Sequence, residues 1–154
     1  MSLSVLDLMQ APEHLPTLAA WHHQEWPALN PGLSLEQRIE SMQGYLTDAL
    51  VPSMFIGLHE GQLAASAAIV ACDMDTRPEW TPWLASVYVK PELRRFGLGS
   101  SLVRQVMSQT QQAGLPQLYL FTPDQASFYQ RLGWQTLQQT LYRDHAVTVM
   151  QIKW

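Results

Sequence analysis

The chain has 154 residues, a formal net charge of −4 at pH 7 and 47% hydrophobic residues. This length predicts a single domain over residues 1–154, and the hydrophobic content is enough for a packed core, which excludes a disordered chain. The acidic balance argues against general nucleic-acid binding, and the lack of any run of ~20 apolar residues argues against a membrane protein.

One cysteine, Cys72, excludes an intrachain disulfide. Because it follows the apolar run 67–71, we expect it to be a buried, inert strand residue. The N-terminus has no basic stretch followed by an apolar run, so no signal peptide is predicted and the protein is expected to be cytoplasmic.

The first half of the chain is predicted to mix strands and helices. Alternating apolar residues indicate a strand over 3–9, and Pro12 starts a helix that runs to about residue 26. The capping box Ser34-Leu-Glu-Gln37 opens a second helix, whose apolar residues repeat every three to four positions as far as residue 50. Two strands over 54–59 and 62–72 follow. They are joined by a tight turn at Glu60-Gly61.

Two polar clusters in this half are open to interpretation. His22, His23 and Glu25 do not have the spacing of a zinc site, so we predict no metal and expect surface or substrate-facing histidines. The loop 73–82 carries Asp73, Asp75 and Glu79 beside Trp80. These groups suit a cationic amine and an ordinary solvated loop equally well.

The central stretch 83–107 predicts an anion-binding turn. A strand over 84–89 ends before Pro91, and a helix over 98–113 follows the sequence Arg94-Arg95-Phe96-Gly97-Leu98-Gly99. The first turn of a helix offers unpaired N–H groups, and the glycines let an anion approach them. A Walker loop would need a lysine and a Rossmann loop a third glycine, and both are missing.

The last third is predicted to finish the sheet. Gly114 ends the long helix, and a strand over 117–121 is expected to run parallel to strand 84–89. Thr122-Pro123-Asp124-Gln125 reads as a capping box that opens a short helix to Leu132. The segments 134–142 and 146–154 then form a terminal hairpin.

Two motifs resemble those of the GCN5-related N-acetyltransferase (GNAT) family. Arg94 to Gly99 is similar to its acetyl-CoA loop, Arg/Gln-x-x-Gly-x-Gly/Ala, and Ala126-Ser-Phe-Tyr129-Gln-Arg-Leu-Gly133-Trp134 is similar to its second hallmark. The element order β-α-α-β-β-β-α-β-α-β-β is also that of the family. The resemblance implies an α/β fold with a mixed sheet, of the GNAT acyl-CoA N-acyltransferase type.

The resemblance implies acetyl-CoA as co-substrate and transfer of its acetyl group to a primary amine of a small molecule or peptide. It assigns Tyr129 as the general acid toward the cofactor sulfur. Backbone donors to the thioester carbonyl would come from the strand residues Val87 to Val89. The implied cofactor-binding residues are Val87, Tyr88, Val89, Arg94, Arg95, Phe96, Gly97, Leu98, Gly99, Ser100 and, in place of the family's asparagine, Thr122.

The general base is left open. Some relatives use a glutamate where this chain has Gln117, which cannot accept a proton, so Glu25, Asp75 and Glu79 are the candidates. The alternative function is a catalytically silent acyl-CoA-binding regulatory module. A homodimer is possible because dimers are common in the family.

Overall fold

A computed structural model describes residues 2–27 and 31–154. The strands and helices in chain order are β1 (Ser4–Asp7), α1 (Leu15–Glu25), α2 (Leu35–Met42), β2 (Ser53–His59), β3 (Gln62–Val70), β4 (Trp83–Val89), α3 (Leu98–Gln112), β5 (Gln117–Thr122), α4 (Ala126–Arg131), β6 (Gln135–Tyr142) and β7 (His145–Lys153). This order confirms the predicted sequence of elements. Short 3-10 turns are present in addition, among them η3 (Gln43–Tyr45) and η4 (Pro91–Leu93).

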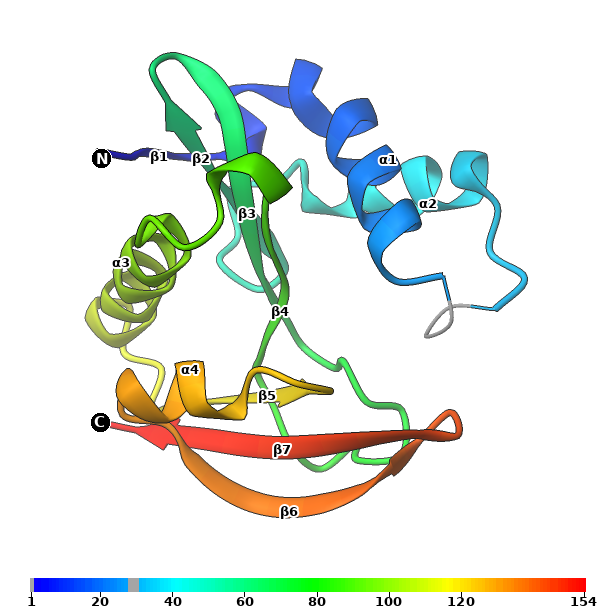
Figure 1. The fold of residues 1–154 in the computed structure, drawn as a ribbon, viewed down its shortest axis with the longest axis vertical. Helices are drawn as coiled ribbons and strands as arrows, with labels where there is room; N and C mark the ends of the chain where they lie inside the picture. Colours follow the sequence, from blue (N-terminus) through cyan, green and yellow to red (C-terminus); the bar gives the residue numbers. More distant parts are fainter. Residues whose placement is uncertain (1, 28–30) are drawn as a thin grey trace.

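The strands form one mixed sheet in the order β1-β2-β3-β4-β5-β7-β6. Only β4 and β5 are parallel, as the strand–helix–strand pattern predicts, and their register pairs Trp83 with Tyr119 alone. The sheet therefore opens at its middle. Figure 1 shows the result, with β1 to β3 in the upper half, β5 to β7 in the lower half and β4 running from one to the other.

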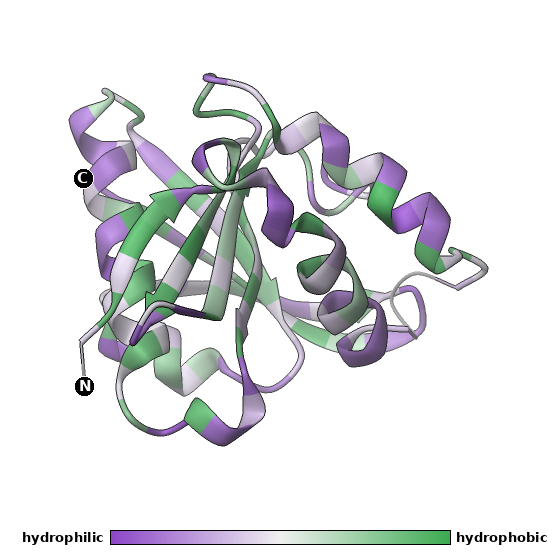
Figure 2. Cartoon of the chain, turned by 90° about the horizontal axis from the view of Figure 1, so that it is seen from above, coloured by the Kyte–Doolittle hydropathy of each residue, from purple (hydrophilic) through white to green (hydrophobic). Residues whose placement is uncertain are grey.

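Helices cover both faces of the upper half. Leu15 and Leu18 of α1 share a core cluster with Met54 and Ile56 of β2, whereas Val103 of α3 belongs to the cluster on the other face. Alternate residues of each strand supply the two clusters, because side chains along a strand point to opposite faces. Figure 2 shows hydrophobic residues along the central strands and hydrophilic residues on the outer turns of the helices.

Several predicted turns are confirmed by backbone geometry. Glu60 and Gly61 both have positive φ, of 52° and 76°, as a two-residue hairpin turn requires. Gly114 has φ of 88° after α3, and Leu115 N donates to Thr110 O at 3.1 Å, which closes the helix end.

Four predicted boundaries were wrong. The first strand is only Ser4–Asp7, since Asp7 caps a 3-10 turn. The helix after Ser34 has the predicted capping box but ends at Met42, because Gly44 lies in the next turn. The strand at 62–72 ends at Val70, so Cys72 is exposed and its thiol donates to Met74 O at 3.3 Å. The short helix begins at Ala126, not at Pro123.

In the described part of the chain, no helix has both the length and the apolar character needed to cross a membrane.

Candidate functional site

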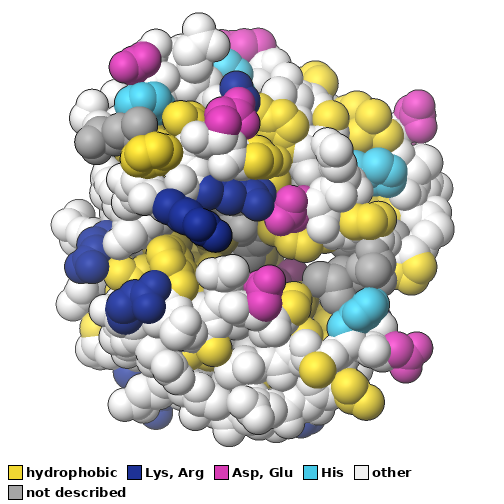
Figure 3. Space-filling model, viewed as in Figure 1, with side chains coloured by type: hydrophobic (Ala, Val, Ile, Leu, Met, Phe, Trp, Pro, Cys, Tyr) yellow, Lys and Arg dark blue, Asp and Glu magenta, His cyan; other side chains and the backbone are white. Residues whose placement is uncertain are grey.

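A cleft of about 970 Å³ lies where the sheet opens between β4 and β5. Six of the nine basic residues of the chain line it, against three carboxylates, although the whole chain is acidic. The six are Arg38, Arg94, Arg95, Arg104, Arg131 and Arg143, and the three are Glu25, Asp73 and Asp124. Figure 3 shows basic side chains gathered around the hollow on this face. The cleft is therefore suited to an anionic ligand.

The β4 strand carries a bulge inside the cleft. Ser66 of β3 pairs with Tyr88 while Ala68 pairs with Ala85, so β4 has one extra residue between these pairs. Ser86 lies there with φ of 52°, a conformation that a non-glycine residue rarely adopts. Because β4 pairs with β5 only at Trp83, the stretch 87–89 has no strand partner on that side. The backbone groups on this side can meet a ligand, except Val89 O, which accepts from Arg94 Nε at 2.7 Å.

A buried hydrogen-bond chain holds the bulge. Ser66 Oγ donates to Ser86 O at 2.9 Å and lies 2.9 Å from His22 Nε2. Since the serine hydroxyl has a single hydrogen, the His22 Nε2 must carry the proton between them. His22 is only 1% exposed. The expectation of a surface or substrate-facing histidine was therefore wrong for His22, which is on the apolar face of α1 and packs toward the sheet.

The protein is expected to lose stability in acid through His22. Burial first, and then Arg38, lower its pKa from 6.5 to about 3. The folded state thus favours the neutral ring, and this stability is complete above pH 6.5 and is lost as the pH falls toward about 3. At about pH 4.5 wild type should lose up to ~3 kcal/mol of unfolding free energy relative to pH 7.5, and His22→Gln clearly less. Urea unfolding at both pH values measures this.

His145→Gln is the matched control, because His145 lies exposed at the start of β7. This variant should keep the wild-type dependence on pH. An equal acid loss in His22→Gln would remove His22 from the explanation.

The loop before α3 has the geometry expected of an anion site. Gly97 has φ of 82°, and a Cβ atom there would meet open space. The first helical bond of α3 is Ser101 N to Gly97 O at 3.0 Å, so the amides of residues 98–100 have no partner within the helix. Gly99 serves a different purpose: its Cβ would lie 3.2 Å from Val89 Cγ2, so glycine permits close packing of α3 on β4.

The two arginines of the loop differ in their surroundings. Arg94 Nε donates to Val89 O at 2.7 Å, and its Nη2 lies 3.3 Å from Glu25 Oε2. Its guanidinium also lies 5.3 Å from the ring centre of Tyr88. It therefore ties the loop to α1. Arg95 has φ of 70° and lines the cleft, and the structure assigns it no ion pair among the described residues.

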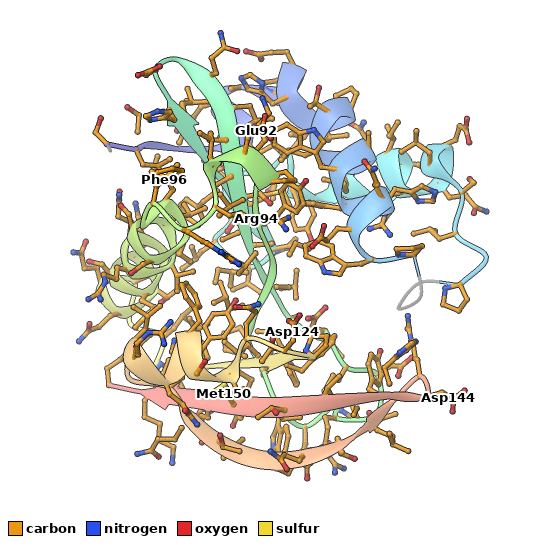
Figure 4. The ribbon with its side chains drawn as sticks, viewed as in Figure 1. Glu92, Arg94, Phe96, Asp124, Asp144 and Met150 are labelled. Carbon is orange, nitrogen blue, oxygen red and sulfur yellow. The ribbon has the colours of Figure 1, made fainter. Side chains whose placement is uncertain are left out.

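The other predicted cofactor residues divide into two groups. Phe96 is 55% exposed and lies outside the cleft, and Leu98 is buried in the core; neither lines the cleft. Figure 4 shows Phe96 beyond α3, with Arg94 and Asp124 on opposite sides of the opening. The residues that do line it are Val87, Tyr88, Val89, Arg94, Arg95, Gly97, Gly99, Ser100, Thr122 and Tyr129.

Tyr129 enters the cleft from α4 on the lower side. Its ring is 7% exposed and packs edge-on against Phe128 and Trp134, at 4.9 Å and 6.0 Å between ring centres. Burial raises the pKa of its phenol, which stays protonated at neutral pH and can donate. Thr122 Oγ1 accepts from Gln125 N at 2.9 Å, which closes a turn before α4, but Gln125 is the N-cap and no side chain caps the helix, so the predicted capping box was wrong.

The three predicted base candidates lie in unlike places. Glu25 lines the cleft but is paired with Arg94. Asp75 and Glu79 are exposed and do not line it, and Asp75 Oδ2 lies 3.5 Å from Arg143 Nη2. Gln117 Oε1 accepts from Gln151 Nε2 at 2.7 Å, so this side chain is tied to β7.

Sequence reasoning missed Arg38, which lines the cleft, and Tyr45, which lies beside it, and it named Asp73 only as one acid of a polar loop and not as a candidate base. Burial raises the pKa of Asp73 to about 7, although Arg143 opposes the shift. Tyr45 lies beside the Ser86 side chain, and burial and Asp73 raise its pKa to about 12. The charge of Arg38 lowers the pKa of Tyr45, which opposes these two effects. Burial lowers the pKa of the Arg38 guanidinium. No local motif marks these residues, because they come from α2, η3 and the loop after β3.

Residues 15–134 match the model of the acetyltransferase (GNAT) family. The chain therefore belongs to this family of acetyl-CoA-dependent enzymes, which confirms the resemblance of the two motifs. None of the curated proteins matches the chain in sequence.

Solved structures of acetyltransferases share the fold. Aminoglycoside 6'-acetyltransferase type Ii superposes with a TM-score of 0.74 at 16% identity, over 99% of this chain and 97% of that chain. Ribosomal-protein-alanine N-acetyltransferase from Brucella melitensis gives 0.73 at 16% identity, over 100% of both chains. PaiA N-acetyltransferase from Thermoplasma acidophilum, in complex with coenzyme A, gives 0.69 at 19%, also over 100% of both. These identities show the fold alone, and confirm the predicted α/β class.

Proposed function

We propose that the protein transfers the acetyl group of acetyl-CoA to a primary amine of a small molecule or peptide. One observation carries this proposal: the free amides of α3, the open stretch of β4 and the Tyr129 phenol all meet in one basic cleft. No cluster of three or more potential metal ligands occurs among residues 2–27 and 31–154. The proposed chemistry uses protein groups only.

The cofactor would lie along the basic side of the cleft. Its pyrophosphate fits the α3 amides at Gly99 and Ser100, with Arg95 nearby, because helix N-termini and guanidinium groups attract phosphate. Its pantetheine arm fits beside 87–89, where β4 lacks a strand partner. The neighbour solved with coenzyme A shares this fold, which supports the placement.

Asp73 is the proposed base and Tyr129 the proposed acid. The carboxylate of Asp73 takes the first proton of the acceptor ammonium and passes it to solvent. The neutral amine attacks the thioester carbon, and backbone N–H groups of 87–89 stabilise the oxyanion. The intermediate collapses, and the leaving thiolate takes the phenol proton of Tyr129. The nitrogen loses its second proton through solvent, which restores the phenol.

The proposal is tested by titrating acetyl-CoA calorimetrically and following free thiol release with a panel of primary amines. Micromolar binding and amine-dependent thiol release are expected. Binding without release from any amine would instead support a silent acyl-CoA-binding module. No binding would refute the cofactor site.

Replacement of Asp73 by asparagine is expected to lower kcat/KM by ~100-fold or more. In wild type kcat/KM should rise with pH through about 7, because Asp73 must lose its proton to act as base. The variant should lose this rise, which pH–rate profiles measure. Since burial favours the protonated form of Asp73, the variant should also be more stable than wild type above pH 7.

Glu79→Gln is the matched control, because Glu79 belongs to the same loop, does not line the cleft and forms no ion pair with another described residue. It should keep both the rate and the pH profile. Full activity in Asp73→Asn would exclude Asp73 as the base.

A further inference from the structure

Arg38 lines the cleft, and no described residue forms an ion pair with it. It lies on α2, and its Nε and Nη2 atoms are covered by protein and have no hydrogen-bond partner in the described structure, whereas Nη1 is not among the covered atoms and is left for a ligand. A buried charge left unpaired is costly, so this arrangement favours a ligand that brings a negative group.

The side chains around Arg38 cannot supply that negative charge. His22 is neutral at pH 7, because its pKa is lowered to about 3. Tyr45 is neutral as well, since its pKa is raised to about 12. Among the described residues, Asp73 is the carboxylate whose charge affects the pKa of Tyr45. The cation that affects the pKa of Asp73 is Arg143 and not Arg38.

The cofactor would not reach Arg38 with its phosphates. The α3 amides and Arg95 lie on the α3 side of the sheet, whereas α2 packs with α1 on the opposite face. Figure 1 shows α3 and α2 on opposite sides of β4. The anion that pairs with Arg38 must therefore belong to the other substrate, the amine acceptor.

Both charges of this part of the cleft lie near one hydroxyl. Asp73 and Arg38 each act electrostatically on Tyr45, and Tyr45 lies beside Ser86 at the β4 bulge. Asp73, Arg38 and Ser86 also line the same cleft, so one small acceptor can meet both charges close to where the acetyl group would be presented. A guanidinium pairs best with a planar carboxylate.

We propose that the acceptor is a small amine that also carries a carboxylate, as an amino acid does, with Arg38 binding the carboxylate and Asp73 facing the amine. This inference rests on the proposed acetyl transfer and specifies its acceptor class. A carboxamide of the same amine would leave Arg38 unpaired and should be a poor substrate.

The test compares the proteinogenic amino acids with their carboxamides as acceptors, at saturating acetyl-CoA, by thiol release. Wild type should show kcat/KM at least ~10-fold higher for the carboxylate of the best pair. Arg38→Met should remove this preference by raising KM for the carboxylate, and Arg38→Lys should keep part of it. Acetyl-CoA affinity should be the same in all three proteins.

Arg77→Met is the matched control, since Arg77 stacks on Trp80 and does not line the cleft. It should keep the carboxylate preference. Arg38→Met should keep or raise the melting temperature, because it removes an unpaired buried charge. A lower melting temperature would instead give Arg38 a structural role.

The outcomes separate this inference from the proposed function. If acetyl-CoA does not bind, the proposed function fails. If acetyl-CoA binds but carboxylates and carboxamides react equally well, the acceptor class is wrong. The acceptor class is also wrong if no amine that carries a carboxylate reacts, or if Arg38→Met still prefers carboxylates to carboxamides.

Discussion

Replacement of Gly97 by glutamate is expected to weaken acetyl-CoA binding by at least ~100-fold, or ~2.7 kcal/mol. Two effects act together. Gly97 has φ of 82°, so any side chain costs about 1 kcal/mol or more in backbone strain. The Cβ would project into open space at the N-terminus of α3, where the free amides face the cleft, and a carboxylate would compete with the cofactor phosphates.

Calorimetric titration of acetyl-CoA into both proteins measures the effect. Gly114→Glu is the matched control, because Gly114 has φ of 88° and open space around its Cβ at the other end of α3. It carries the same strain and charge but lies away from the cleft, so it should bind acetyl-CoA as wild type does. Equal affinity in Gly97→Glu would show that the phosphates bind elsewhere.

The sequence predicted well what local chemistry decides. The loop Arg94 to Gly99, the parallel pair around α3 and Tyr129 on α4 all follow from strand, glycine and helix patterns that act within a few residues. The helix after Ser34 shows the limit of such patterns. Its apolar repeat continues to Leu50, but the helix ends at Met42, before the 3-10 turn that contains Gly44.

The acceptor side depends on contacts that are distant in sequence. The Ser86 bulge is held by Ser66 and His22, which are 20 and 64 positions away along the chain. Asp73 was visible as one acid in a polar loop, but only its burial beside Tyr45 distinguishes it from Asp75, since Arg143 acts on both. Burial of a charged group is a tertiary property, and no periodicity encodes it.

Replacement of Tyr129 by phenylalanine is expected to reduce kcat by ~100-fold to ~1,000-fold with little change in acetyl-CoA affinity. The phenol lines the cleft and stays protonated at neutral pH, so it has a proton to offer the leaving thiolate, although burial raises its pKa and makes it a weaker acid. The ring of phenylalanine preserves the edge-on contacts with Phe128 and Trp134, so the fold should not change. Stopped-flow or steady-state thiol release measures kcat, and calorimetry measures affinity.

Tyr119→Phe is the matched control for this variant. Tyr119 is also 7% exposed, but its hydroxyl accepts from Gln151 Nε2 at 3.2 Å outside the cleft. It should keep full kcat, so a loss specific to Tyr129→Phe isolates the cleft hydroxyl from the general effect of removing a buried one. If Tyr129→Phe keeps wild-type kcat with the best acceptor, the thiolate takes its proton from water, and Tyr129 serves only to pack α4 against β6.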